Sequence, residues 1–266
     1  ANREVEAYLL KVADYWISEF DIDAWRLDVA DEVDHTFWKK FRTTCDAAKD
    51  DFYILGEVWH SAQPWLVGDE FSAVMNYAYT DAIKDGLITK KISLEQMVSN
   101  INTQLTLYRK QVNQMMFNVL DSHDTPRILT VAKNNKNLMK LVETFTFMQP
   151  GVPCIYYGDE YAVTGGMDPE CRKVMPWEEK DQDLEMFEFF KNLIALRKQY
   201  QGILSDSEVE WKIVDSENGI VKFERGSLKA IFNIGEKPAY FSADEVVFSN
   251  LVDQNNILQY GFVIYK

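Results

Sequence analysis

A short apolar run ends in a carboxylate at Trp25-Arg26-Leu27-Asp28-Val29-Ala30, and this stretch sets a pattern for the chain. The pattern returns at Ile54-Leu55-Gly56-Glu57-Val58-Trp59 and at Val119-Leu120-Asp121-Ser122-His123-Asp124. Brief apolar runs of this kind are typical of buried parallel strands, whose tips reach the edge of a sheet. Cleavage of a glycosidic bond needs two carboxyl groups that flank the bond. Three acid-ended strands in order, each with a polar or aromatic companion, therefore favour a sugar-cleaving site.

Helical segments are predicted between these strands from the spacing of their apolar residues. The helices are expected over residues 2–20, 37–49, 93–111, 138–148 and 183–200, and the strands near residues 25–28, 52–57, 73–77, 115–120 and 152–157. Asn2 is the expected cap of the first helix. Its apolar face is expected to comprise Val5, Tyr8, Leu9, Val12, Trp16, Ile17 and Phe20.

Alternating strands and helices imply βαβ units and a parallel sheet. In a (β/α)8 barrel the functional side chains lie at the C-terminal ends of the strands and in the loops that follow. Asp28, Glu57 and Asp124 all have that placement.

After Gln201 the sequence changes to short runs in which apolar and polar residues alternate. These runs predict a small antiparallel β domain. Asn218-Gly219 is a two-residue hairpin signal within it. We therefore expect two domains, residues 1–202 and residues 203–266.

Charge and composition limit the classes of partner that this protein is expected to bind. The 266 residues carry 42 acidic and 28 basic side chains, a net charge of −14. Nucleic acid and anionic membranes are therefore not expected partners. Cys45, Cys154 and Cys171 are an odd number and form no Cys-x-x-Cys pair, which favours a reducing compartment over a disulfide framework. No apolar stretch approaches the roughly 18 residues of a membrane span. No metal-binding pattern is present either, so we expect no metal or cofactor in this chain.

The three acid-ended segments resemble the second, third and fourth signature regions of the α-amylase family of retaining glycoside hydrolases. The resemblance to the cyclomaltodextrinase, neopullulanase and maltogenic amylase branch extends over Asp23–His35, Val74–Tyr77, Ser122–Arg127, Gln149–Glu160 and Gly165–Trp177. It implies a fold in which the five C-terminal strands of a (β/α)8 barrel, the fourth to the eighth, are followed by a small antiparallel β-sandwich.

The family's first signature region, which carries an Asp, an Asn and a His, has no match here. His35, His60 and His123 all belong to other segments. We therefore expect the chain to be the C-terminal part of a larger enzyme, with any calcium bound by the part that precedes it. Five strands cannot close an eight-stranded barrel, so the open strand edges are expected to drive self-association or to need the missing section.

The resemblance implies that Asp28 is the nucleophile and Glu57 the acid/base of a double displacement. Arg26 lies two residues before Asp28, so both side chains point to one face of the strand. A guanidinium there would orient the Asp28 carboxylate and keep it ionised. Glu57 has to start protonated, for which Val58 and Trp59 would supply an apolar wall. The structural alternatives are an ion pair for Asp28 and a strand-end cap for Glu57.

The resemblance also implies that Asp124 and His123 bind hydroxyls of the distorted sugar, with an ordinary turn as the alternative. Asp168 and Arg172 would hold a more distant sugar, although their i, i+4 spacing also suits a surface ion pair. Further expected substrate-binding residues are Trp59, which is equally suited to the core, and His60 and Tyr77.

The expected function is hydrolysis of α-1,4 bonds, with α-1,6 bonds as a further target, in maltooligosaccharides and cyclodextrins, and transglycosylation as a side reaction. One alternative is another enzyme of the family, an α-glucosidase or an α-amylase. The other is a non-catalytic glucan-binding or structural protein that retains part of the barrel.

Overall fold

The computed structural model describes residues 2–266, which form two compact units. Among these residues the first unit comprises 2–78 and Leu105–Phe117, and the second comprises Tyr79–Gln104 and Asn118–Lys266. The expected domain boundary after residue 202 stays a prediction. No helix in residues 2–266 has the length and apolarity that a bilayer crossing requires.

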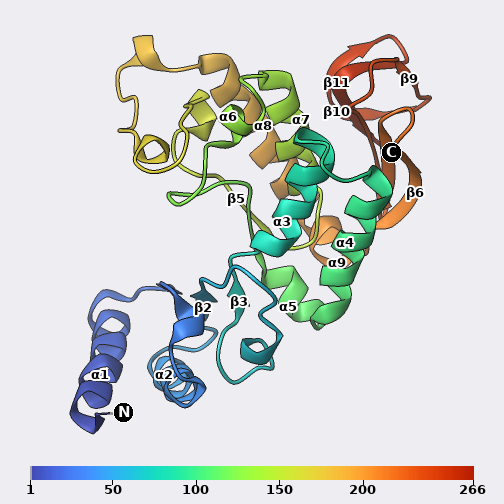
Figure 1. The fold of residues 1–266 in the computed structure, drawn as a ribbon. Coiled ribbons are helices and arrows are strands. Elements are labelled where there is room, and N and C mark those ends of the chain that lie inside the picture. The colour runs from blue at the N-terminus through green and yellow to red at the C-terminus, as the bar shows by residue number, and fades with distance from the viewer. Residues whose placement is uncertain (1) are drawn as a thin grey trace. The chain divides into compact units, whose positions relative to one another are not determined.

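The predicted alternation of strands and helices is present from the first strand to the eighth helix (Figure 1). The helices are α1 (Arg3–Phe20), α2 (His35–Ala48), α3 (Tyr77–Ile83), α4 (Leu94–Leu107), α5 (Lys110–Met115), α6 (Ile128–Val131), α7 (Lys136–Phe147), α8 (Leu184–Gln199) and α9 (Gln201–Asp206). The strands are β1 (Ala24–Leu27), β2 (Tyr53–Gly56), β3 (Ala73–Val74), β4 (Phe117–Val119), β5 (Val152–Cys154), β6 (Glu210–Asp215), β7 (Ile220–Arg225), β8 (Leu228–Asn233), β9 (Ala239–Tyr240), β10 (Val246–Asp253) and β11 (Asn256–Tyr265).

The register of the parallel strands in the first unit sets the position of two acids. β1 pairs with β2 and β2 with β3, all parallel, and Leu27 lies opposite Gly56. The residues that follow this pair, Asp28 and Glu57, therefore leave the sheet side by side at its C-terminal edge. The Glu57 N–H donates to the Leu27 carbonyl at 2.9 Å, which continues the ladder to the site.

Helix α1 begins as predicted but does not bury its apolar face. The Asn2 side chain accepts hydrogen bonds from the N–H groups of the first turn, and α1 lies beside α2 (Figure 1). Of the expected face only Ile17 is buried. Val12 is half-buried, and the rest of the face is exposed: Val5, Tyr8, Leu9, Trp16 and Phe20. The physical reason is that within residues 2–266 β1 pairs with β2 alone, so α1 has no strand to cover beyond β1.

Helix α7 is the central element of the second unit. Its residues from Leu138 to Phe147 are all buried, and it contacts β11, α8 and β5. The carbonyl groups at its C-terminal end, which have no partner within the helix, accept from two arginines. Arg197 donates to the Phe147 carbonyl at 2.6 Å and Arg225 donates to the Met148 carbonyl at 2.5 Å. Burial lowers the pKa of both arginines to about 10.

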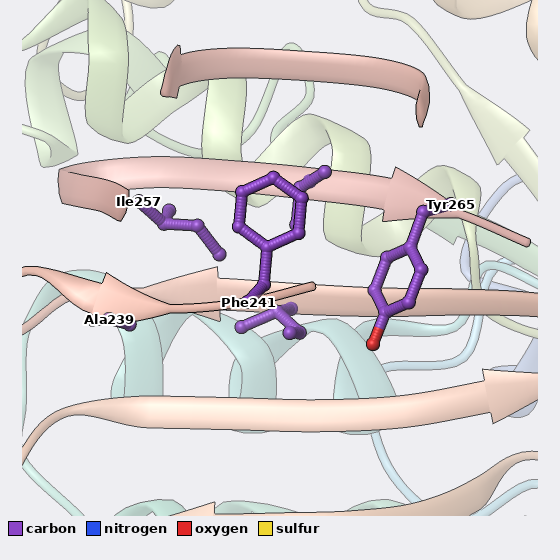
Figure 2. Packing of buried hydrophobic residues seen from close by; sticks show 6 residues of the cluster. Ala239, Phe241, Ile257 and Tyr265 are labelled. Atoms are coloured by element: carbon purple, nitrogen blue, oxygen red, sulfur yellow. The ribbon is translucent and has the colours of Figure 1, made fainter. Parts of the chain in front are cut away.

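The C-terminal strands form one antiparallel sheet in the order β10-β11-β8-β7-β6, with β9 on β11. Figure 2 shows part of its packing, where Phe241 lies between Ile257 and Tyr265 in a cluster that also contains Ala239. The predicted antiparallel region is therefore present, whereas the sandwich arrangement stays a prediction.

The hairpin between β6 and β7 differs from its prediction. Asp215 pairs with Ile220, so the loop holds four residues rather than two. The Asp215 carboxylate accepts from the backbone and side-chain N–H groups of Asn218, and this Asx-type turn sets the longer loop. Gly219 follows at φ 71°, where only glycine is unstrained.

Substitution of Gly235 tests the contact between this loop and the bend that follows β8. A Cβ on Gly235 would lie 1.9 Å from the Asn218 carbonyl oxygen, so Gly235→Ala requires the backbone to move. We expect a loss of about 1–3 kcal/mol in the free energy of unfolding, measured by urea denaturation. Gly202→Ala is the matched control, because nothing lies within 4 Å of its added Cβ. That helical substitution is expected to be neutral or stabilising by up to about 1 kcal/mol, and equal losses in both variants would contradict the account.

Candidate active site

Arg26 joins the two acids at the tips of β1 and β2. Its Nη1 forms an ion pair with Asp28 Oδ1, and its Nη2 lies 2.7 Å from Glu57 Oε1. The second contact is a close ion pair without the alignment of a hydrogen bond. The expected placement of Arg26 and Asp28 on one strand face is thus found. The structure adds that the same guanidinium reaches the neighbouring strand.

The two acids differ in their surroundings. The Asp28 side chain is 72% exposed, whereas that of Glu57 is 5% exposed. The second carboxylate oxygen of Glu57 accepts the Val29 N–H at 2.9 Å. Both carboxylate oxygens of Glu57 thus have polar partners, and the apolar wall of Val58 and Trp59 stays a prediction. An exposed carboxylate beside a fixed, buried one is a chemically sensible pair, because the first is open to attack a substrate and the second is held in place.

Trp59 lies on Tyr77 and leaves its other face open. The two rings are stacked at 4.0 Å between centroids with an interplanar angle of 5°. Trp59 is 46% exposed and Tyr77 is 1% exposed. The structure therefore makes Tyr77 a support for Trp59, while the exposed indole is the face on which a sugar ring could stack. His60 is exposed, and its Nε2 lies 3.1 Å from Asp31 Oδ2, a partner that sequence reasoning missed.

The remaining predicted residues meet within the second unit. Arg172 Nη2 donates to Asp124 Oδ1 at 2.9 Å, and Arg172 Nε lies 3.1 Å from Asp168 Oδ1. His123 Nε2 lies 3.1 Å from Asp124 Oδ2, and the His123 carbonyl accepts from Arg172 Nε at 2.9 Å. The i, i+4 ion pair of Asp168 and Arg172 is thus present. Arg172 also connects it to the His123-Asp124 turn, a link that residue spacing alone did not indicate.

Sequence reasoning missed a set of buried charged groups beside this turn. They are Asp121, Arg127, Glu143 and Asp159, none of which is more than 3% exposed. Asp121 and Asp159 could have been found from the sequence, because each follows a predicted strand within a segment that resembles the family.

Two strand-tip carboxyl groups held by one guanidinium are the kind of acid pair that glycoside hydrolases use. The chain belongs to the α-amylase family: its residues 1–183 match the family model described as "Alpha amylase, catalytic domain". This confirms the family resemblance seen in the sequence.

Three similar proteins show which branch of the family this chain resembles. The chain is 47% identical over 260 residues to an intracellular maltogenic amylase of Bacillus subtilis, covering 96% of this chain and 44% of the relative. It is 51% identical over 217 residues to a cyclomaltodextrinase of Geobacillus thermopakistaniensis, covering 82% of this chain and 37% of the relative. A solved cyclomaltodextrinase structure superposes with a TM-score of 0.88 at 36% identity, covering 99% of this chain and 48% of that one. The chain therefore spans less than half the length of each of these relatives.

Proposed function

We propose that this protein is a retaining α-glucan hydrolase of the cyclomaltodextrinase, neopullulanase and maltogenic amylase type. Its substrates would be maltooligosaccharides and cyclodextrins, cleaved at α-1,4 bonds, with α-1,6 bonds as a further target. The observation that carries the proposal is the contact of Arg26 with both Asp28 and Glu57 at the C-terminal edge of the parallel strands. The names of the relatives support the substrate class.

In this proposal Asp28 attacks the anomeric carbon while Glu57 protonates the leaving glycosidic oxygen. A covalent glycosyl–enzyme forms and the first sugar product departs. Glu57, now ionised, takes a proton from water, and the resulting attack at the anomeric carbon releases Asp28 and the second product. When a sugar hydroxyl replaces water in the second step, the product is a transglycosylated glucan. Arg26 orients both carboxylates and offsets the charge that Asp28 regains.

The other predicted residues would bind sugar. Asp124 and His123 would hydrogen-bond hydroxyls of the distorted ring, and Arg172 with Asp168 would hold a sugar further along the chain. The exposed face of Trp59 would stack on a ring, with Tyr77 behind it and His60 beside it. The contacts of Arg172 with both His123 and Asp124 support treating these residues as one unit of function.

Several wider expectations stay part of this proposal. We place the protein in the cytoplasm, which the word "intracellular" in the name of a Bacillus subtilis relative supports. We expect no cofactor within this chain, with any calcium bound by the part of the barrel that the chain lacks. We also expect the open strand edges either to drive self-association or to need that missing section. A division into a barrel portion up to residue 202 and a β-sandwich beyond it completes the proposed architecture.

The alternative is a non-catalytic glucan-binding or structural role. It is favoured by the apolar groove of about 570 Å³ beside the edge strand, between α1, β1 and α2. Within residues 2–266 the outer edge of β1 has no strand partner, so it is a surface at which another polypeptide could pair.

A chimera separates these functions. The aligned region of the Bacillus subtilis relative is replaced by this chain, and sugar release from β-cyclodextrin and maltoheptaose is measured for the chimera, its Glu57→Gln variant and the 266-residue chain alone. Hydrolysis by the chimera that Glu57→Gln abolishes supports the enzyme. A folded chimera that binds maltoheptaose without cleaving it would contradict the enzymatic proposal and favour the alternative.

A further inference from the structure

Arg127 is a buried cation between two loops of the second unit. One loop, residues 120–127, follows β4 and carries His123 and Asp124 (the β4 loop), and Arg127 is its last residue. The other, residues 155–172, follows β5 and ends at Arg172 (the β5 loop). The Arg127 side chain is 0% exposed. A buried guanidinium is costly unless its donors find acceptors, so its partners show which parts of the chain it holds together.

Arg127 binds the β5 loop at separate points along its length. Its Nε donates to the Cys171 carbonyl at 3.0 Å, and its Nη1 donates to the Tyr157 carbonyl. The same Nη1 lies 3.4 Å from Oδ1 of the buried Asp159, which compensates the charge. The backbone N–H of Arg127 donates to the Gly165 carbonyl at 3.0 Å. One planar fork and one backbone group thus fix the start, the middle and the end of this loop.

The start of the β5 loop fits closely around the guanidinium. The ring centroids of Tyr156 and Tyr157 lie 4.1 Å and 4.6 Å from the central carbon of Arg127, within the range of cation–π attraction. Gly158 has a φ of 90°, and a Cβ there would lie 3.3 Å from Arg127 Nη1. This close approach of backbone to guanidinium therefore requires glycine.

Cys171 and its neighbour connect this contact to the β4 loop. The Cys171 carbonyl accepts from Arg127, while the Cys171 thiol donates to the His123 carbonyl at 3.1 Å. Arg172, the next residue, donates to the same His123 carbonyl and to Asp124 Oδ1, both at 2.9 Å. His123 Nε2 in turn lies 3.1 Å from Asp124 Oδ2. A continuous path of contacts therefore runs from the buried guanidinium to the backbone and the side chains of the His123-Asp124 turn.

We propose that Arg127 is a positioning residue for His123 and Asp124. By fixing the Cys171 carbonyl it sets the place of Cys171 and Arg172, and these two residues hold the turn in the orientation that binds sugar. Arg127 acts through its neighbours and not on the substrate. The importance of this hold for sugar cleavage rests on the proposed function, whereas the hold on the turn does not.

A second buried arginine separates positioning from ordinary stabilisation. Arg225 is also 0% exposed and lies in the same unit, but it donates to the carbonyl groups of Met148, Leu204 and Ser207, none of which belongs to the β4 or the β5 loop. Substitution of either arginine by leucine leaves buried carbonyls without a donor, so both variants lose stability. Only Arg127→Leu is expected to displace the turn.

The ring resonances of His123 report on the turn. The chain has three histidines, so His123 can be assigned by NMR of the 266-residue chain with the His123→Gln variant. At neutral pH we expect Arg127→Leu to shift the His123 resonances away from their wild-type positions. His35 and His60 belong to the first unit and should stay in place. Arg225→Leu should leave all three histidines unshifted, even though it is destabilised.

Conservative variants test each step of the path. Arg127→Lys keeps the charge, but an ammonium lacks the planar fork that spans the Tyr157 and Cys171 carbonyls, so it too should shift His123. Cys171→Ala removes the thiol donor and should shift His123 in turn, whereas Cys171→Ser retains a donor and should restore the wild-type position at least in part.

In the chimera the effect should fall on kcat. Groups that hold the distorted ring act mainly in the transition state, so their displacement lowers kcat with little change in KM. We expect Arg127→Lys to lower kcat for maltoheptaose by about 10–100-fold, the size that a displacement of about 1 Å produces. Arg225→Leu, measured below its unfolding transition, should retain the kcat of the unsubstituted chimera.

Each result decides for or against the positioning role. Unshifted His123 resonances in both Arg127→Leu and Arg127→Lys would overturn it, as would an equal shift in Arg225→Leu. An active chimera whose kcat is unchanged by Arg127→Lys would also overturn it. If Arg127→Leu does not fold, Arg127→Lys and the two Cys171 variants still decide. The NMR readout does not require catalysis, so the expected shifts in a protein whose chimera cleaves no glucan would support the hold on the turn and count against the proposed function alone.

Discussion

Glu57→Gln in the chimera is expected to lower kcat for maltoheptaose by at least about 10³-fold, since a positioned general acid contributes about 10²–10⁴-fold and this residue serves in both steps. The amide has nearly the same size, and its single oxygen can keep the contact with either the Val29 N–H or Arg26. The variant therefore keeps the shape of the site while it loses proton transfer and one of these two contacts. Steady-state release of reducing sugar measures kcat.

Substrates with good leaving groups provide an internal test of this role. Protonation matters little when the leaving group is fluoride, so Glu57→Gln should retain the first chemical step with α-maltosyl fluoride while losing the second. Glu178→Gln, at an exposed carboxylate, is the matched control and should retain full activity. Retention of more than about one-tenth of the wild-type kcat by Glu57→Gln would contradict the assignment, given the usual size of general acid catalysis.

Arg225→Leu is expected to cause the largest loss of stability among single substitutions in the second unit, about 3–5 kcal/mol. Arg225 is fully buried and donates to the carbonyl groups of Met148, Leu204 and Ser207. Leucine has no donor, so these buried carbonyls would lose their partners at the ends of α7 and α9. Urea denaturation of the 266-residue chain measures the change.

The control for Arg225 is an exposed cation of the same unit. Lys198→Leu alters the last turn of α8 without removing a buried hydrogen bond and should change the free energy of unfolding by less than about 0.5 kcal/mol. A loss of less than about 1 kcal/mol in the free energy of unfolding of Arg225→Leu would mean that the Met148, Leu204 and Ser207 carbonyls find other partners. That result would contradict the conclusion that Arg225 holds the C-terminal end of α7.

The placement of Asp28 and Glu57 at strand ends could be predicted from the sequence, because it depends on strand register. Asp28 and Glu57 each follow an apolar run, and two parallel strands in register place such residues side by side. The period-2 alternation of a strand also predicted correctly that Arg26 and Asp28 share a face. That Arg26 would reach Glu57 as well could not be predicted, since it depends on the spacing between strands.

Sequence patterns could not predict the contacts between loops. The Arg172–Asp168 pair follows from local spacing, but the contact of Arg172 with Asp124 joins residues 48 positions apart. The apolar face of α1 was predicted, but its exposure was not. Periodicity shows that a helix has an apolar face, whereas burial depends on whether another element lies against it.

Two buried acids of the second unit illustrate a third limit. Asp121 and Asp159 each follow a strand, as a catalytic acid would, and nothing in their sequence context separates them from Asp28. They are 3% and 1% exposed, unlike Asp28, and this difference emerges only when β4 and β5 are paired in space.

The most direct test of the central claim is to identify the residue that carries the covalent sugar. The Glu57→Gln chimera is incubated with α-maltosyl fluoride, digested and analysed by mass spectrometry. Because the second step needs the missing base, the glycosyl–enzyme should accumulate, and the account predicts one maltosyl group on the peptide that contains Asp28, absent in Asp28→Asn. A maltosyl group on another carboxylate, or turnover of the fluoride by Asp28→Asn at the wild-type rate, would contradict it.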